Sequence, residues 1–390
     1  MAISAIFFVN GIVMASWVSR IPTITDKLNL SNAATGTALM AIAVGSLFAF
    51  QVVGRLLVRR SSATVTFAFA VLLVAALPFA ALAPSIYLLI AALLVLGFGT
   101  GGMDVAMNSQ GVEVENAVET NIMSSLHGFY SLGAFVGAGL GAAAAALDLP
   151  PWAHFVIIAV FGLATILSTR HWMVPDAPEA KHQHDEAPVF AFPPRALWLL
   201  GLVAFSAAVC EGAIADWSGL YLKNELGTSA GFAALGFASF QLAMLIGRFA
   251  GDGMVRRFGP VQIVRRGGLI ASIGVAAALL IGLPVPTLLG FMAAGIGLAT
   301  AYPLAMSAAG NYKFLPRGQS VASVATVGYT GFLVGPPVLG WVAHVTSLTW
   351  TIGVVSVLCL LVAVFANATH DAGAGHADDP AVAAGTVSAN

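Results

Sequence analysis

The chain has 390 residues, of which 59% are hydrophobic and 8% are charged. Soluble globular proteins carry about 25% charged residues, so water is not the main solvent of this chain. The formal net charge of -1 gives no basic excess, which argues against nucleic acid as a partner. Both cysteines, Cys210 and Cys359, lie inside apolar stretches and indicate neither a disulfide framework nor a zinc site. The composition therefore predicts a membrane protein in contact with a lipid bilayer.

Twelve apolar stretches follow one another along the chain, each near the roughly 20 residues needed to cross a bilayer. The first has no basic residues before it and no small-residue cleavage site after it, so we expect a retained span rather than a signal peptide. The stretches lack the alternation of a β-barrel, which predicts helices. The predicted spans are Ala2 to Ile21, Ala33 to Val58, Ala63 to Ala83, Ser85 to Gln110, Ile122 to Leu147, Trp152 to Thr169, Ala196 to Leu222, Ala230 to Val255, Val261 to Leu283, Val285 to Gly310, Val321 to Val345 and Thr349 to Ala366.

The charges between the spans predict the orientation. With the N-terminus inside, the outer loops hold Arg20, Lys27 and Lys223, and the other 13 of the 16 Lys and Arg residues lie on inner loops or inner helix ends. The positive-inside rule therefore predicts a multi-pass membrane protein with both termini in the cytoplasm. We predict four segments: an N-terminal six-helix bundle at 1–170, a cytoplasmic linker at 171–195, a C-terminal six-helix bundle at 196–368 and a disordered tail at 369–390.

Short motifs recur between the two halves at almost one spacing. Gly97 in the fourth span and Gly133 in the fifth each have an equivalent glycine 198 positions later, at Gly295 and Gly331. The string G-R-L-L-V-R-R that begins at Gly54 recurs, 197 positions later, as G-D-G-M-V-R-R. Transporters are commonly built from repeated helix bundles with the binding site at the interface between repeats. The recurrence therefore predicts an internal duplication with a site between the halves.

This organisation resembles the major facilitator superfamily, whose fold is an all-α membrane protein of twelve helices in two pseudo-symmetric six-helix bundles. The resemblance rests on the twelve spans, the long linker after the sixth and the short basic loops after the second and eighth. The family's loop signature has an Asp and then two basic residues, and Asp252, Arg256 and Arg257 match it. The resemblance implies that these three residues form an inner gate. In the first half, Arg55 stands at the position of the Asp.

Three further motifs resemble a bacterial branch of this family that includes fucose/proton symporters. They read G-G-M-D-V-A-M-N-S-Q in the fourth span, S-L-H-G-F-Y-S-L-G in the fifth and E-G-A-I-A-D-W-S-G-L-Y-L in the seventh. An acid followed four positions later by an amide, as in Asp104 and Asn108, is similar to the fourth helix of those symporters. Their first helix also carries a carboxylate, where this chain has Ala15, Ser16 and Trp17. The resemblance therefore implies proton coupling through Asp104 without the complete relay.

Asp104 is the strongest candidate for chemistry because a carboxylate inside a span costs about 2.5 to 3.5 kcal/mol and is normally kept in a cavity or a pair. Asn108 lies one helical turn further along the same face. The alternative is structural, with Asp104 joining helices through a buried hydrogen bond. His127 is expected at a similar depth and is either a second proton-coupling group or a hydrogen-bonded packing histidine.

Glu211 and Asp216 share the seventh span, but a separation of five residues places them about 140° apart around a helix. We therefore predict different roles for them. Glu211 is assigned to the central cavity and to proton coupling, and Asp216 to an outer gate in which it pairs with Arg20. The alternative for Arg20 is an anchor at the membrane interface.

Polar and aromatic residues in several spans could line a substrate cavity. Each has an alternative role as glue between helices or as part of the aromatic belt. Tyr302 is favoured because it stands 198 positions after Asp104, at the duplicated position. The predicted cavity residues are Asn108, Asn10, Trp17, Gln51, Trp217, Gln241, Tyr302 and Tyr329.

These features predict a secondary active transporter that moves a small polar solute, sugar-like or a related metabolite, by alternating access and with proton coupling. Proton-driven efflux of a metabolite or drug is the main alternative, and a non-transporting membrane sensor is another. We do not expect an enzyme, because no nucleophile constellation is present. We expect no cofactor and no metal, since no phosphate-binding Gly-Lys-Ser/Thr loop occurs and His182 and His184 lack a third ligand at a suitable spacing.

Overall fold

The computed structural model describes residues 2–118, 122–175, 193–312 and 317–370. Helices dominate these ranges, and they contain no β-strand. Within them, ten helices are long and apolar enough to cross a membrane. Most of the predicted linker, at 176–192, and the predicted tail beyond 370 lie outside the described residues.

Seven helices make up the first half. Their bounds are α1 Ala2–Ser19, α2 Ile21–Lys27, α3 Asn32–Arg59, α4 Ser62–Leu82, α5 Ile86–Val118, α6 Met123–Ala146 and α7 Pro151–Thr169, followed by the 3₁₀ turn η1 Arg170–Trp172.

The second half begins with the 3₁₀ turn η3 Arg195–Leu197. The helices that follow are α8 Trp198–Leu220, the π-helical η4 Tyr221–Glu225, α9 Ala230–Phe258, α10 Pro260–Ile281, α11 Pro284–Leu298, α12 Ala301–Gly310, α13 Arg317–Val345, α14 Leu348–Val364 and the 3₁₀ turn η5 Ala366–Thr369.

Most predicted spans end within a few residues of the observed helices, but three differ. The span predicted to end at Gln110 continues in α5 to Val118. The first span ends at Ser19, and α2 is a separate short helix with Pro22 in its first turn, where proline is favoured. The predicted span from Val285 to Gly310 is broken between α11 and α12. The break has a local cause, because Pro303 has no amide hydrogen to donate to the carbonyl of Ala299 one turn earlier.

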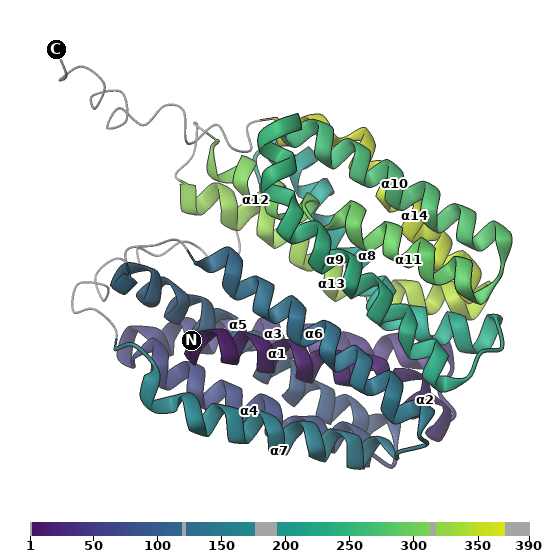
Figure 1. Ribbon diagram of the computed structural model, residues 1–390, viewed down its shortest axis with the longest axis horizontal. Coiled ribbons are helices and arrows are strands. Elements are labelled where there is room, and N and C mark those ends of the chain that lie inside the picture. Colours follow the sequence, from purple (N-terminus) through teal and green to yellow (C-terminus); the bar gives the residue numbers. More distant parts are fainter. Residues whose placement is uncertain (1, 119–121, 176–192, 313–316, 371–390) are drawn as a thin grey trace.

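The helices form two bundles that lie side by side (Figure 1). Corresponding helices pack in corresponding pairs. In the first bundle α1 packs on α6, α3 on α5 and α4 on α7, and in the second α8 packs on α13, α9 on α11 and α10 on α14. Two equivalent pairs, α6 with α9 and α3 with α13, join the bundles. The fold is therefore a pseudo-symmetric pair of helical bundles.

The recurring glycines explain part of this symmetry. A Cβ atom at Gly97 would overlap the carbonyl oxygen of Ile42, and a Cβ atom at Gly295 would overlap the carbonyl oxygen of Phe240. Ile42 and Phe240 are themselves 198 positions apart. The same close approach of two helices thus occurs at the same place in both halves, and it requires a residue without a side chain. The duplication predicted from sequence is therefore present in the packing.

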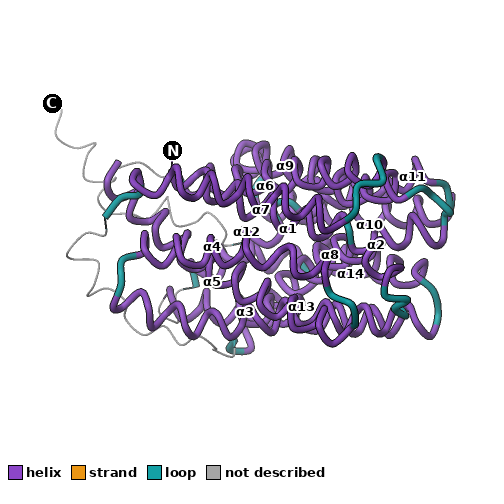
Figure 2. Tube along the Cα trace, turned by 90° about the horizontal axis from the view of Figure 1, so that it is seen from below, coloured by secondary structure: helices purple, strands orange, loops and turns teal. Residues whose placement is uncertain are grey.

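The long helices run roughly parallel to the long axis of the molecule, and most loops lie at its two ends (Figure 2). We call the end where α7 stops at Thr169 and α8 begins at Trp198 the linker end. The opposite end, where α1 stops at Ser19 and α8 stops at Leu220, is the distal end. Large apolar side chains such as Leu280 are exposed on the outer faces of the bundles, as expected of a surface that contacts lipid.

Candidate functional site

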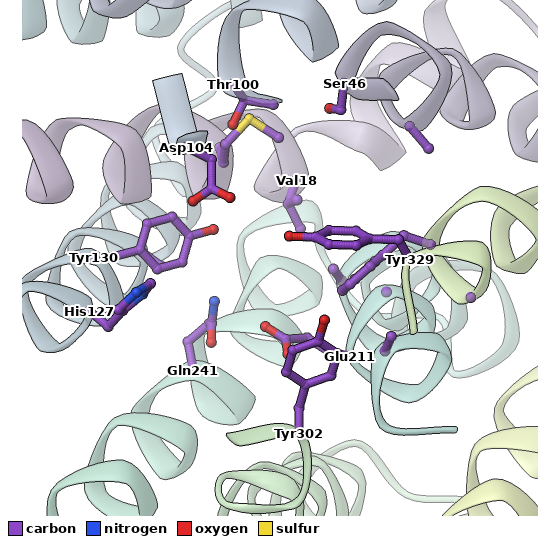
Figure 3. Close-up of a pocket in the computed structure, with 18 of the residues that line it drawn as sticks. Val18, Ser46, Thr100, Asp104, His127, Tyr130, Glu211, Gln241, Tyr302 and Tyr329 are labelled. Atoms are coloured by element: carbon purple, nitrogen blue, oxygen red, sulfur yellow. The ribbon is translucent and has the colours of Figure 1, made fainter. Parts of the chain in front are cut away.

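A cavity of about 800 Å³ lies between the two bundles. Its wall comes from α1, α3, α5 and α6 of the first half and from α8, α9, α12 and α13 of the second, together with Ala299 and Thr300 at the break before α12. These are the equivalent helices of the repeat. Polar side chains from both halves converge on this space (Figure 3). The predicted site between the repeats therefore corresponds to a real cavity.

Asp104 lies near the middle of α5 and lines the cavity. The side-chain amide of Asn108 donates to Asp104 Oδ1 at 3.2 Å and to the Asp104 carbonyl oxygen at 2.7 Å. Asn108 Oδ1 lies 3.1 Å from His127 Nε2 on α6. One amide therefore connects the carboxylate and the imidazole across two helices. His127, expected at a similar depth to Asp104, is thus linked to it through Asn108, which was predicted to line the cavity but is not among the residues that do.

Arg248 on α9 links three helices, and the sequence reasoning missed it. Its Nη1 donates to Ser131 Oγ on α6 at 2.9 Å, and its Nη2 lies 3.9 Å from Glu211 Oε2 on α8. The hydrogen bond to Ser131 crosses between the two halves of the chain. Arg248 falls inside the predicted span from Ala230 to Val255, and a charge inside a span was the signal that could have identified it.

Three tyrosines surround the carboxylates. Tyr130, Tyr302 and Tyr329 line the cavity, and all three are within electrostatic range of Asp104. Tyr130 and Tyr302 are also within electrostatic range of Glu211. The hydroxyl-bearing rings come from both halves, as Figure 3 shows. Tyr130 was not among the predicted residues, whereas Tyr302 and Tyr329 were.

Asn10 and Gln241 also line the cavity, as predicted. Asn10 is buried and held by the first half, because Thr100 donates to its Oδ1 at 3.1 Å and its own amide donates to the sulfur of Met107 at 3.7 Å. Gln241 is 5% exposed and has no hydrogen-bond partner among the described residues. Its amide points into the cavity (Figure 3).

The two tryptophans predicted at equivalent positions differ. Trp17 lines the cavity, but it is 2% exposed and packs against Phe155. Trp217 is fully buried beside Gly340 and is not part of the wall. Trp217 therefore does not line the cavity as predicted, because its side chain fills the packing between α8 and α13. Gln51 on α3 is also outside the wall.

The predicted pair of Arg20 and Asp216 does not form in this structure. Arg20 is buried, its Nη2 donates to the carbonyl oxygen of Leu149 at 2.5 Å, and Asp148 supplies a nearby negative charge. Asp216 instead lines the same cavity as Glu211. The two acids lie on different faces of α8, as predicted from their spacing, but Asp216 was expected at an outer gate and lines the cavity, because the cavity wraps around a wide arc of this helix.

The predicted inner gate lies at the linker end of α9. Arg256 and Arg257 are exposed there, with the guanidinium of Arg257 5.2 Å from the centre of the Phe258 ring. The side chain of Asp252 lies outside the described residues. No group of three or more His, Cys, Asp or Glu side chains among the described residues is arranged to hold a metal ion.

The two halves also meet at the distal end. Lys223 in η4 forms an ion pair with Asp26 in α2. Asn32 Nδ2 at the start of α3 donates to the carbonyl oxygen of Ala343 in α13 at 3.4 Å. The cavity wall, in contrast, reaches Gly251 and Val255 near the linker end of α9. The halves are thus joined beyond the distal limit of the cavity.

Comparison with known proteins agrees with this architecture. Residues 2–315 match the Major Facilitator Superfamily. The chain is 34% identical to an uncharacterized MFS-type transporter of Yersinia pestis, with 93% of each chain covered, and 30% identical to the membrane protein MosC of Rhizobium meliloti, with 89% of this chain and 84% of that one covered.

Two kinds of solved structure share the fold. One is the nucleoside transporter NupG in a mutant form, with a TM-score of 0.75, 13% identity and coverage of 94% of this chain and 98% of that one. Another is a bacterial homologue of the human lysosomal transporter Spinster in an inward-facing and occupied conformation, with a TM-score of 0.70, 16% identity and 96% coverage of both. At these identities the likeness concerns the fold alone. The family match and the relatives show that this chain belongs to the major facilitator superfamily and is a multi-pass membrane protein that acts as a secondary transporter rather than an enzyme.

Proposed function

We propose that this transporter moves a small polar solute, sugar-like or a related metabolite, together with protons by alternating access. The observation that supports this proposal is the hydrogen-bonded series of Asp104, Asn108 and His127, of which Asp104 and His127 line a cavity between the halves. The likeness of Asp104 and Asn108 to the fucose/proton symporters belongs to the same proposal. We further propose the bacterial inner membrane as the location, with both termini and the linker in the cytoplasm.

Asp104 is the proposed proton-binding group. A carboxylate in a low-dielectric cavity is costly when charged, so binding a proton there favours the movement of the loaded cavity through the membrane. The Asn108 amide can donate to the charged carboxylate, and its oxygen can accept from His127 Nε2. This arrangement positions His127 as a second proton site close to the linker end of α6. Glu211, whose carboxylate faces Arg248, is the third proposed coupling group.

Alternating access requires two gates. At the distal end, the ion pair of Lys223 with Asp26 and the contact of Asn32 with α13 are proposed to hold the cavity closed. At the linker end, Arg256 and Arg257 remain the proposed gate residues, together with Asp252. We propose that the bundles at 1–170 and 196–368 rock about the cavity as the two gates open in turn.

Efflux of a larger apolar compound is the second candidate. Phenylalanines from both halves, Phe50, Phe237, Phe249 and Phe332, contribute to the cavity wall, and about 800 Å³ exceeds the needs of a single small sugar. Both directions can use the same proton site, so the direction is decided by the sign of the coupled proton movement.

The test is proton movement in proteoliposomes driven by a panel of sugars, small acids and common drugs, with wild type compared with Asp104→Asn. We expect one class of compound to drive proton flux in wild type and the variant to lose that flux while still binding the compound. Alkalinisation of the external medium identifies uptake of solute with protons from that side. Unchanged flux in Asp104→Asn would show that Asp104 is structural.

A further inference from the structure

The described cavity wall carries more acidic than basic side chains. Three carboxylates, those of Asp104, Glu211 and Asp216, line the cavity, and Arg248 is the only Lys or Arg on its described wall. Carboxylates that face a low-dielectric space without a counter-charge are costly, and they raise the local concentration of cations. The cavity therefore favours positive over negative solutes by its fixed charges.

The three carboxylates differ in their partners. Asp104 accepts from the Asn108 amide. Glu211 lies 3.9 Å from Arg248, and the same guanidinium is also held by Ser131 at 2.9 Å. Asp216 has neither an ion pair nor a hydrogen bond within the described part of the chain. Among the three, Asp216 is thus the acid that receives neither a counter-charge nor a hydrogen bond from the described residues.

Two further features of the wall point to a ligand. Gln241 is 5% exposed, lacks a partner among the described residues and directs its amide into the cavity, so it can exchange hydrogen bonds with a solute. Tyr130, Tyr302 and Tyr329 present aromatic rings to the same space (Figure 3). An aromatic face attracts a cation within about 6 Å of the ring centre.

We propose that the solute carries a positive charge, as an amine-bearing polar molecule, and that Asp216 is its counter-charge. This inference rests on the proposed transport function and names its substrate class. Asp104 is left for the coupled proton, and Glu211 stays with Arg248. Gln241 and the tyrosine rings, which line the same cavity, then contact the remainder of the solute.

The test is equilibrium binding to the purified full-length chain in detergent at about pH 6.5, where simple amines are protonated. Two matched sets of probes separate charge from shape: glucosamine with N-acetylglucosamine and glucose, and benzylamine with benzyl alcohol and benzoate. We expect the amine of at least one set to bind about tenfold more tightly than its neutral partner, equivalent to about 1.4 kcal/mol. Asp216→Asn should remove that preference and Asp216→Glu should retain it.

Glu225→Gln is the matched control, because Glu225 is a carboxylate at the distal end outside the cavity wall, and glutamine keeps an oxygen that can accept from the Leu348 amide. The inference is overturned if in neither set the amine binds more tightly than its neutral or anionic partners, or if the preference survives in Asp216→Asn. Since binding is measured without proton flux, the two proposals fail separately. Proton-coupled movement of a neutral solute would overturn only the substrate class, and amine binding without coupled protons would overturn only the coupling.

Discussion

The two halves of this transporter share the same helix packing but carry different side chains at equivalent positions of the cavity wall. At positions 198 residues apart, α5 carries Asp104 and α12 carries Tyr302, and both line the cavity. At another pair with the same separation, Gly97 and Gly295 make equivalent close approaches to a neighbouring helix. The difference teaches that packing positions tolerate few residue types, whereas cavity positions are free to diverge because they face a solute and not another helix.

The sharpest test of this asymmetry is to alter the equivalent cavity residues one at a time. We expect Asp104→Asn to lower coupled proton flux by about 100-fold or more, the scale on which a positioned proton-transfer group contributes. Tyr302→Phe removes only a hydroxyl and should lower the flux by less than about tenfold. Proton flux is measured in proteoliposomes for both variants. Equal losses of flux would contradict the proposal that Asp104 binds the coupled proton and that its equivalent, Tyr302, does not.

The second test addresses the shared frame. Gly97→Ala and Gly295→Ala each place a methyl group against a backbone carbonyl, so we expect each to lower the stability by about 1 to 3 kcal/mol, as overpacking does. Thermal unfolding in detergent measures the change. Gly139→Ala is the control, because a Cβ atom there meets nothing within 4 Å. A Gly97 variant as stable as this control would contradict the close packing.

The third test concerns the bond that joins the halves inside the cavity. Arg248→Gln removes the donor to Ser131 and leaves Glu211 without its counter-charge, so transport should fall by about tenfold. Glu211→Gln should cost less transport in the Arg248→Gln chain than in wild type, with a coupling of about 0.5 to 3 kcal/mol in a double-mutant cycle. Strictly additive effects would show that the two side chains act independently.

The smallest effect is expected at the distal end. The side chains of Lys223 and Asp26 are 24% and 53% exposed, and exposed ion pairs contribute about 1 kcal/mol or less. Lys223→Ala should therefore lower the unfolding temperature only slightly, and high salt should reduce the difference further. A loss as large as that of Gly97→Ala would mean that this contact holds the halves together far more strongly than its exposure implies.

Much of the fold was predictable because a stretch of about 20 mostly apolar residues is enough to identify a membrane-spanning helix. Apolar length and punctuation by proline, glycine and charge located the spans, since backbone groups in lipid must be satisfied within each helix. The recurring glycines predicted the duplication before any packing was known. The break between α11 and α12 was missed even though Pro303 is visible in the sequence, because proline is tolerated inside membrane helices and does not always end them.

The candidate site was predictable only in part. Asp104, His127 and Tyr302 were identified because a polar group within a span, or a residue at a duplicated position, is unusual in the sequence itself. Arg248 was overlooked because it was counted among the basic residues at inner helix ends, which normally anchor a helix at the membrane interface. Its contacts with Ser131 and Glu211 join residues more than 30 positions apart in the chain.

By itself, the sequence determined that this protein lies in a lipid bilayer, where its helical spans and internal repeat are, and that Asp104 is a carboxylate inside a span. Each of these follows from local composition or from one fixed spacing. Only the tertiary structure decided which side chains share the cavity. Trp217 is buried, Asp216 faces the cavity and Arg20 contacts Leu149, although all three lie near span ends that look alike in sequence. The physical reason is that the direction of a side chain depends on how its helix is rotated against neighbours from distant parts of the chain.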